Sequence, residues 1–128
     1  MDSRKFTINF AGTVDASANK TFASRRIGGP YIMRKVRANF DAAANSLVKY
    51  YFYISKDAEV PTATKPQGTN ILSELGQEVY LAADDQVIEF AHEIIVAEGG
   101  TYIKLYVENG IAASMPIAAQ VTIELFDE

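Results

Sequence analysis

The sequence predicts an all-β protein, an eight-stranded antiparallel β-sandwich. Apolar and polar residues alternate in eight short segments, turn residues separate these segments at fairly regular spacing, and no segment has the periodicity of an amphipathic helix. The expected strands are 6–10, 20–24, 31–40, 47–55, 78–82, 86–96, 101–108 and 115–125. Eight strands favour a jelly roll, with strands 1, 8, 3 and 6 in one sheet and 2, 7, 4 and 5 in the other. The alternative is an immunoglobulin-like sandwich, which usually has seven strands and a core tryptophan, and this chain has no tryptophan.

Alternation defines the first three strands. Phe6, Ile8 and Phe10 share one face of the first strand, and Phe22 is the centre of the short second strand. A Gly-Gly-Pro break at 28–30 separates the second strand from the third. In the third strand the residues expected to point inward are Ile32, Val36, Ala38 and Phe40, and those expected to point outward are Met33, Lys35, Arg37 and Asn39.

The fourth strand follows an alanine-rich turn at 41–46. The side chains of one face are Val48, Tyr50, Phe52 and Ile54, and those of the other are Lys49, Tyr51 and Tyr53. This β-branched and aromatic content suits a pleated, half-buried surface.

Residues 56–77 form the one long irregular stretch, and they include Pro61 and Pro66. Within this stretch, residues 70–75 predict a single helical turn anchored by Ile71, Leu72 and Leu75. Long loops inside compact domains are often functional, but a crossover packed down by its own leucines is the interpretation we prefer.

The remaining strands complete the sandwich. A short fifth strand at 78–82 is followed by a sixth at 86–96, expected to be continuous. A Gly-Gly turn precedes the seventh strand, and the eighth has the cleanest alternation of all. Its inward residues are Met115, Ile117, Ala119, Val121, Ile123 and Leu125.

Length and composition indicate one domain over residues 1–128. The net charge of −4 argues against general affinity for nucleic acid or anionic membranes. The chain has no cysteine, no apolar run at its start typical of a signal peptide and no apolar stretch long enough for a membrane span. We therefore expect a protein that is made and used without secretion.

The charge is divided between the two halves of the chain. Residues 1–56 contain ten Lys and Arg against three Asp and Glu, whereas residues 57–128 contain two against thirteen. Each sheet of a jelly roll takes strands from both halves, so these charges interleave in space. The remaining asymmetry is between the ends of the sandwich: one end holds Arg25 and Arg26, and the acidic residues of the other are Asp15, Asp41, Asp84 and Asp85.

Catalytic and metal-binding combinations are missing from the pattern. His92 is the only histidine, which excludes a Ser–His–acid triad or a metal site with two imidazoles within one copy of the chain. Glu89 and Glu93 lie on a polar strand face, where we expect their carboxylates to be solvated. A glycosidase needs its two carboxylates in a cleft, so this pair does not indicate one. Asp84 and Asp85 lack the spacing of a calcium loop. We expect no enzymatic activity, no metal and no cofactor.

Basic residues gather around the second and third strands. Arg25, Arg26, Lys35 and Arg37 lie within a short stretch of sequence. They form either a solvated strand face or a docking surface for an acidic partner, where arginine makes bidentate contacts to carboxylates.

Tyrosines concentrate on the fourth and seventh strands, which are neighbours in a jelly roll. Tyr51 and Tyr53, facing out beside Tyr102 and Tyr106, would form a flat platform. Exposed aromatic clusters of this kind bind protein partners or stack against sugar rings, and we prefer a protein interface.

The segments 6–10, 31–40, 100–109 and 115–125 carry a resemblance in strand order and composition. The chain resembles the jelly-roll decoration (cement) or minor capsid proteins of tailed bacteriophages. The resemblance implies a virion structural protein, assembled as a homotrimer, whose partner is the major capsid protein or another virion protein. A tail or fibre β-domain is similarly compatible, and a carbohydrate-binding module that uses the tyrosine platform is the alternative from another class.

Overall fold

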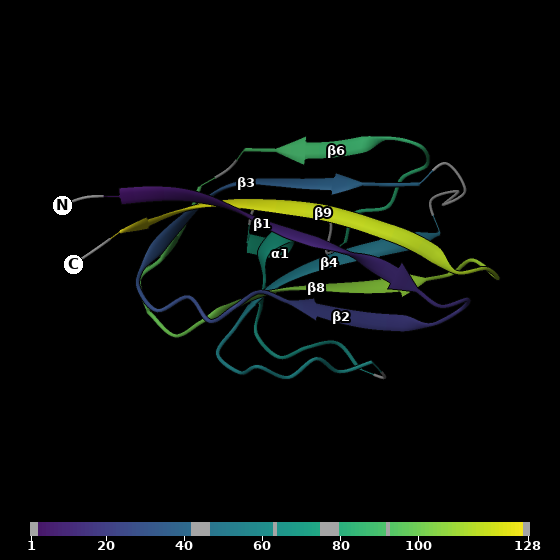
Figure 1. Cartoon of the computed structure of the whole chain (residues 1–128), viewed down its shortest axis with the longest axis horizontal. Coiled ribbons are helices and arrows are strands. Elements are labelled where there is room, and N and C mark those ends of the chain that lie inside the picture. The colour runs from purple at the N-terminus through teal and green to yellow at the C-terminus, as the bar shows by residue number, and fades with distance from the viewer. Residues whose placement is uncertain (1–2, 42–46, 63, 75–79, 92, 127–128) are drawn as a thin grey trace.

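The protein is an antiparallel β-sandwich of two sheets packed face to face (Figure 1). The computed structural model describes residues 3–41, 47–62, 64–74, 80–91 and 93–126. The first sheet contains β1 (Ser3–Val14), β9 (Met115–Phe126), β3 (Tyr31–Asn39), β6 (Val87–Phe90) and β7 (Ile94–Val96). The second contains β2 (Asn19–Ala23), β8 (Tyr102–Asn109), β4 (Val48–Ser55) and β5 (Thr69–Asn70). This arrangement confirms the predicted all-β sandwich.

The strand order along the sheets is β1-β9-β3-β6 and β2-β8-β4-β5, with β7 also paired to β3. If β6 and β7 are counted together, the first sheet has the predicted order, and so do β2, β8 and β4 of the second sheet, whereas β5 is a strand that the sequence did not predict. The expected sixth strand is therefore two strands rather than one, and both pair with β3.

The predicted fifth strand at 78–82 is described only at residues 80–82. There Leu81 makes a single antiparallel bridge to Tyr50 of β4, the strand beside which this segment was expected. β4 also pairs with β5, where Thr69 lies opposite Ile54. The expected helical turn is confirmed as α1 (Ile71–Glu74), and residues 42–46 of the predicted turn at 41–46 lie outside the described residues.

A β-bulge in β3 corrects the predicted orientation of its first half. The register against β9 shifts between Met33 and Lys35, so Arg34 is the extra residue. Met33 is fully buried, although alternation placed it outward with Lys35, and Ile32 is only half-buried. The strict alternation rule fails here because an inserted residue exchanges the two faces of a strand.

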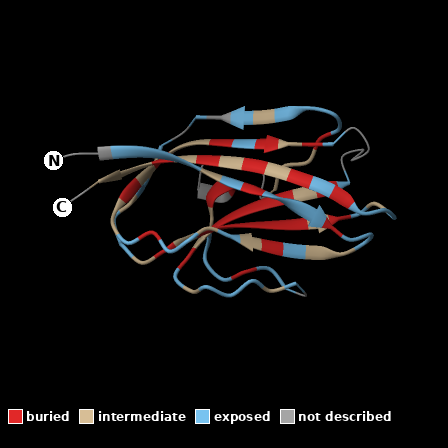
Figure 2. Cartoon of the chain, in the orientation of Figure 1, coloured by how far each residue is buried: buried red, intermediate tan, exposed pale blue. Residues whose placement is uncertain are grey.

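The core fills the space between the sheets, where inward residues of β3, β4, β8 and β9 meet (Figure 2). In β9, the predicted inward residues from Met115 to Ile123 are buried and Leu125 is half-buried. Ile71 and Leu72 of α1 belong to the same core. The loop that precedes α1 is thus anchored by its own apolar residues, as the sequence predicts.

Candidate functional site

The side of the sandwich between β1 and β2 is only partly closed. β1 has 12 residues and β2 has five, so β1 extends for about 40 Å and β2 for about 17 Å. The core-facing side chains of β1 become less exposed along the strand, from 40% at Phe6 to 3% at Phe10 and 1% at Val14. The N-terminal half of β1 therefore lacks a strand of the opposite sheet to cover its inner face.

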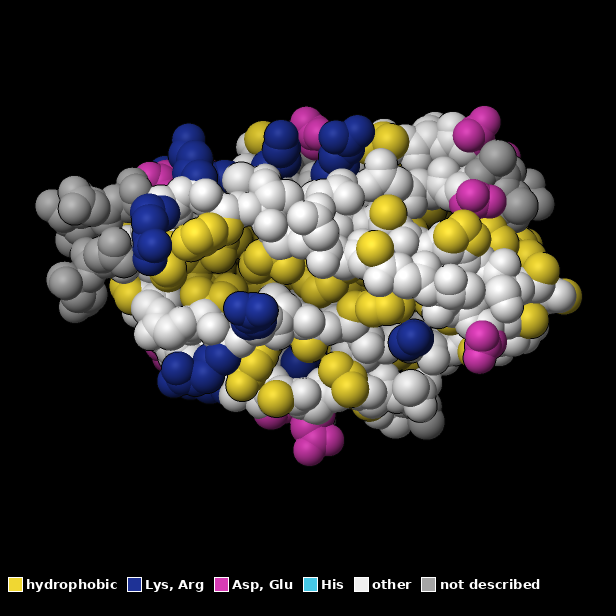
Figure 3. Space-filling view, in the orientation of Figure 1, with side chains coloured by type: hydrophobic (Ala, Val, Ile, Leu, Met, Phe, Trp, Pro, Cys, Tyr) yellow, Lys and Arg dark blue, Asp and Glu magenta, His cyan; other side chains and the backbone are white. Residues whose placement is uncertain are grey.

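A groove of about 550 Å³ occupies this uncovered space. Its apolar lining comes from Phe6, Ile8, Ile27, Ile123 and Leu125. Figure 3 shows the corresponding hollow of hydrophobic side chains between the sheets, with Lys and Arg side chains around it. We call it the β1 groove.

The β1 groove ends where Gly12 meets Phe22. A Cβ atom at Gly12 would lie 2.8 Å from Cε1 of the Phe22 ring, closer than real contacts allow. Glycine thus lets β2 pack directly onto β1, which closes this side of the sandwich beyond the groove.

Arginines surround the other end of the β1 groove. The Arg4 guanidinium lies 5.4 Å from the centroid of the Phe6 ring, and Arg25 and Arg26 contribute to the lining. Among the described carboxylates, none lies within 4.0 Å of the Arg25 or Arg26 guanidinium. Arg25 and Arg26 therefore give this end of the groove positive charge that no described carboxylate contacts directly.

The loop that carries these arginines is fixed to the start of β8. The amide of Ile27 donates to the carbonyl of Thr101 at 2.8 Å, and the amide of Gly100 donates to the carbonyl of Ile27 at 2.7 Å. Gly100 has a φ of 79° and lies beneath the Arg26 guanidinium, where a Cβ would be 2.8 Å from the nearest guanidinium nitrogen. These contacts hold the loop that carries Arg25 and Arg26 in a fixed position, so the arginine pair is preorganised for binding.

The other two predicted basic residues lie elsewhere. Lys35 and Arg37 project from the outer face of β3, and each lies 3.9 Å from the carboxylate of Glu89, which they share. They line a polar hollow with Thr7 and Gln120, so the structure divides the predicted set into two pairs. Arg25 and Arg26 lie beside the apolar lining of the β1 groove, whereas Lys35 and Arg37 lie on a polar face of the first sheet.

The expected exposed tyrosine platform is wrong. Tyr51, Tyr53 and Tyr106 are buried in a small cluster of their own, and Tyr102 is half-buried. The Tyr51 hydroxyl donates to Glu108 Oε1 at 2.6 Å, and burial raises the pKa of Tyr51 well above its ordinary value. β4 and β8 are therefore covered on both faces, which alternation alone does not reveal.

Residues 56–62 and 64–68 contribute part of the cover. The Lys65 ammonium lies 4.8 Å from the centroid of the Tyr51 ring, and the Thr21 hydroxyl of β2 donates to the carbonyl of Pro61. We call these two described segments together the covering loop. It crosses the outer face of the second sheet, where the platform was expected.

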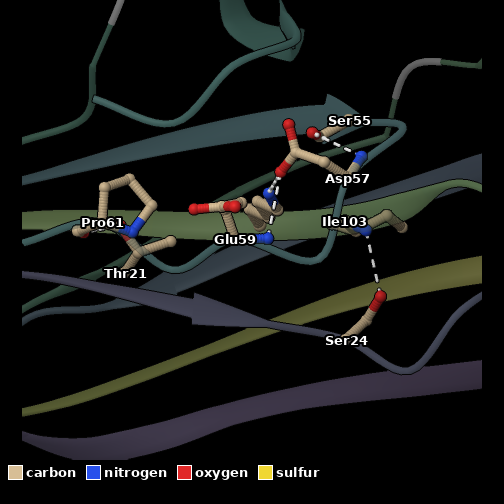
Figure 4. Close-up of polar contacts among 8 residues, drawn as sticks. Thr21, Ser24, Ser55, Asp57, Glu59, Pro61 and Ile103 are labelled. Atoms are coloured by element: carbon tan, nitrogen blue, oxygen red, sulfur yellow. Dashed lines mark hydrogen bonds and ion pairs between the residues drawn. The ribbon is translucent and has the colours of Figure 1, made fainter. Parts of the chain in front are cut away.

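The ion pair of Lys104 and Asp57 ties the covering loop to β8. Lys104 has 0% exposed surface, and its Nζ lies 2.5 Å from Oδ1 of Asp57. The same carboxylate oxygen accepts a hydrogen bond from the amide of Glu59 at 3.0 Å (Figure 4). The hydrogen bond from Lys104 is the main reason why the pKa of Asp57 is lowered.

Sequence reasoning missed Lys104, although a signal was present. The acidic second half of the chain has only two basic residues, and Lys104 is the one inside a strand between aromatic and apolar neighbours. A lysine at such a position requires a carboxylate partner when it is buried.

Among the earlier catalytic candidates, His92 lies outside the described residues. In the described parts of the chain, no three His, Cys, Asp or Glu side chains are close enough to share a metal ion. No helix among these residues is long and apolar enough to cross a membrane. Of the residues expected at the acidic end, the structure brings the loops of Asp41 and Asp85 together, because the amide of Asp85 donates to the carbonyl of Asp41 at 3.2 Å.

Comparisons with known proteins found distant structural similarities. No protein-family model matches the chain, and no curated protein matches it. A subunit of the disulfide-linked pili of Bacillus endospore appendages has 16% identity and a TM-score of 0.45, covering 98% of this chain and 89% of that one. The infectious bursal disease virus VP2 subviral particle gives 12% identity and a TM-score of 0.48, over 95% of this chain and 32% of that one. The Yersinia pseudotuberculosis-derived mitogen gives 8% identity and a TM-score of 0.42, over 96% of this chain and 88% of that one. Likenesses this distant do not distinguish one function from another.

Proposed function

We propose that this chain is a non-enzymatic structural protein that assembles through protein–protein contacts, as a decoration or minor capsid protein of a tailed-bacteriophage virion. The observation that carries the proposal is the β1 groove, an apolar hollow with Arg25 and Arg26 in its lining. Apolar surface with a polar rim marks interaction sites, and arginine is enriched at interfaces. The proposed partner is an acidic surface of the major capsid protein or of another virion protein.

Lys35 and Arg37 are proposed as a second contact of lower affinity. Their charges are already partly balanced by Glu89, so a partner carboxylate gains less from them than from the groove arginines. We further propose a homotrimer, as the resemblance to decoration proteins implies. Light scattering on the purified chain tests the trimer directly, because a monomeric mass at working concentration would contradict it.

The carbohydrate-binding alternative is not favoured by the geometry. It depended on tyrosine rings lying flat on the surface, and three of the four are buried. Sugar rings stack on exposed aromatic faces, which Tyr51, Tyr53 and Tyr106 do not offer.

Binding to purified particles of the virus that encodes the chain tests the proposal. The double variant Arg25→Gln, Arg26→Gln should lower affinity by about tenfold or more, since charge-assisted hydrogen bonds contribute about 1.5 kcal/mol or more each. The matched control Lys56→Gln, Lys65→Gln removes the same charge from the covering loop and should bind normally. Unchanged binding of the arginine variant would contradict electrostatic docking, and absence of the chain from the particles would contradict a virion role.

A further inference from the structure

β1 has one edge free for pairing among the described residues. It is the terminal strand of the first sheet, and its 12 residues pair on one side only, with β9. In an antiparallel ladder about half of the backbone amides and carbonyls of such a strand point away from its partner. A long strand with an unpaired edge is a template for another strand.

The free edge borders the β1 groove. Arg4, Phe6 and Ile8 alternate with Lys5 and Thr7, so they share the core-facing side of the strand where no strand of the second sheet covers it. A strand added at this edge would direct every second side chain toward the groove. Main-chain pairing would then give affinity, and the groove would select apolar side chains.

The charge of the site indicates which strand fits. Arg4 lies on the core-facing side, and Arg25 and Arg26 line the groove beside it. A second copy of β1 would bring its own Arg4 and Lys5 into this cationic region, and like charges placed together destabilise strand pairing. An acidic segment is attracted by the same residues, so the charges favour a different protein over a second copy.

We propose that an extended, acidic segment of a partner protein adds as an edge strand to the N-terminal half of β1. Its alternate apolar side chains enter the β1 groove, and its carboxylates pair with Arg25 and Arg26. This inference rests on the proposed function, for which it names the mode of docking. It predicts that the partner contributes a segment of about five to eight residues, the usual length of a strand.

Amide hydrogen exchange with a synthetic peptide tests the inference. The probe is a peptide of about eight residues in which valine alternates with threonine and which ends in Glu-Asp. The control peptide has the same composition except for a proline at a central position, which cannot donate to a ladder. With the first peptide, alternate amides between Arg4 and Asn9 should exchange at least about tenfold more slowly, and the proline peptide should give no such protection.

The outcomes separate this inference from the proposed function. Peptide binding that depends on Arg25 and Arg26 but leaves the β1 amides unprotected would overturn strand addition and leave electrostatic docking intact. Equal protection in the variant Arg25→Gln, Arg26→Gln would overturn the role of charge in selecting the strand. Protection that appears without peptide and rises with protein concentration would mean that a second copy occupies the edge, which would overturn the partner segment. If the peptide does not bind, but particle binding still requires Arg25 and Arg26, then strand addition is overturned and the proposed function stands.

Discussion

Lys104 and Asp57 join the covering loop to the outer face of the second sheet, with Nζ and Oδ1 2.5 Å apart. The lysine is buried, whereas the side chain of Asp57 is 41% exposed. The two partners are thus unequal: loss of the carboxylate leaves a buried ammonium unpaired, but loss of the ammonium leaves a carboxylate in contact with water.

This difference between the two partners predicts the order in which variants of the pair lose stability. Asp57→Asn should destabilise the fold more than Lys104→Met, because methionine fills much of the same space without a charge. The double variant should be more stable than Asp57→Asn alone. Urea unfolding of the three variants measures the order, and additive effects of the two substitutions would contradict it.

The same pair predicts a dependence on acid pH. The pKa of Asp57 is lowered in the folded protein, so its contribution to stability is complete above the ordinary value of about 3.9 and is lost as the pH falls through the lowered value. Unfolding measured from pH 7 down to about pH 2 should show a smaller acid loss in Asp57→Asn than in the wild type. An identical pH profile in both proteins would show that Asp57 does not contribute.

Tyr50 predicts a loss of stability at alkaline pH. Its hydroxyl donates to the carbonyl of Asn39 at 2.8 Å, and burial raises its pKa to about 12. Because an unfolded tyrosine ionises near pH 10, its contribution is complete below that pH and is lost as the pH rises toward 12. Tyr50→Phe should cost about 1 kcal/mol at neutral pH, retain the stack on Phe40 and weaken the alkaline loss. A titration of tyrosine absorbance in both proteins checks the assignment.

The contact between Gly12 and Phe22 predicts a steric effect. Gly12→Ala places a methyl group 2.8 Å from the Phe22 ring and should cost about 1–3 kcal/mol as the ring moves. Phe22→Leu in the same chain should recover part of that loss. Gly28→Ala is the matched control, because the nearest atom is 3.8 Å away at the Arg26 guanidinium, and it should leave stability nearly unchanged. Equal effects of the two alanines would contradict the packing described.

Alternation predicts the sheets well where one face meets the core and the other meets water. β9 and β1 follow it throughout, and their register from Ser3–Phe126 to Val14–Met115 is unbroken. It fails at Arg34, because a bulge adds one residue without any change in composition.

The candidate site was predictable only in part. Arg25 and Arg26 stand out in the sequence, but the β1 groove depends on the difference in length between β1 and β2, and the strand ends are the least certain feature of a pattern. The exposure of the tyrosines was predicted wrongly. Alternation shows on which face of the sheet they lie, but it does not show that a loop covers that face. Lys104 is the residue that reveals such a cover once its burial is known.

Site-directed photo-crosslinking on assembled particles tests the central claim that the β1 groove is the docking site. Because the chain has no cysteine, single cysteines at Gly28→Cys, in the groove, and Ala112→Cys, beyond the far end of β8, can each carry a benzophenone label. We expect the label at residue 28 to crosslink to a virion protein through an acidic, extended segment and the label at residue 112 to give little product. Crosslinking to that protein from residue 112 alone, or from both sites equally, would contradict docking through the groove.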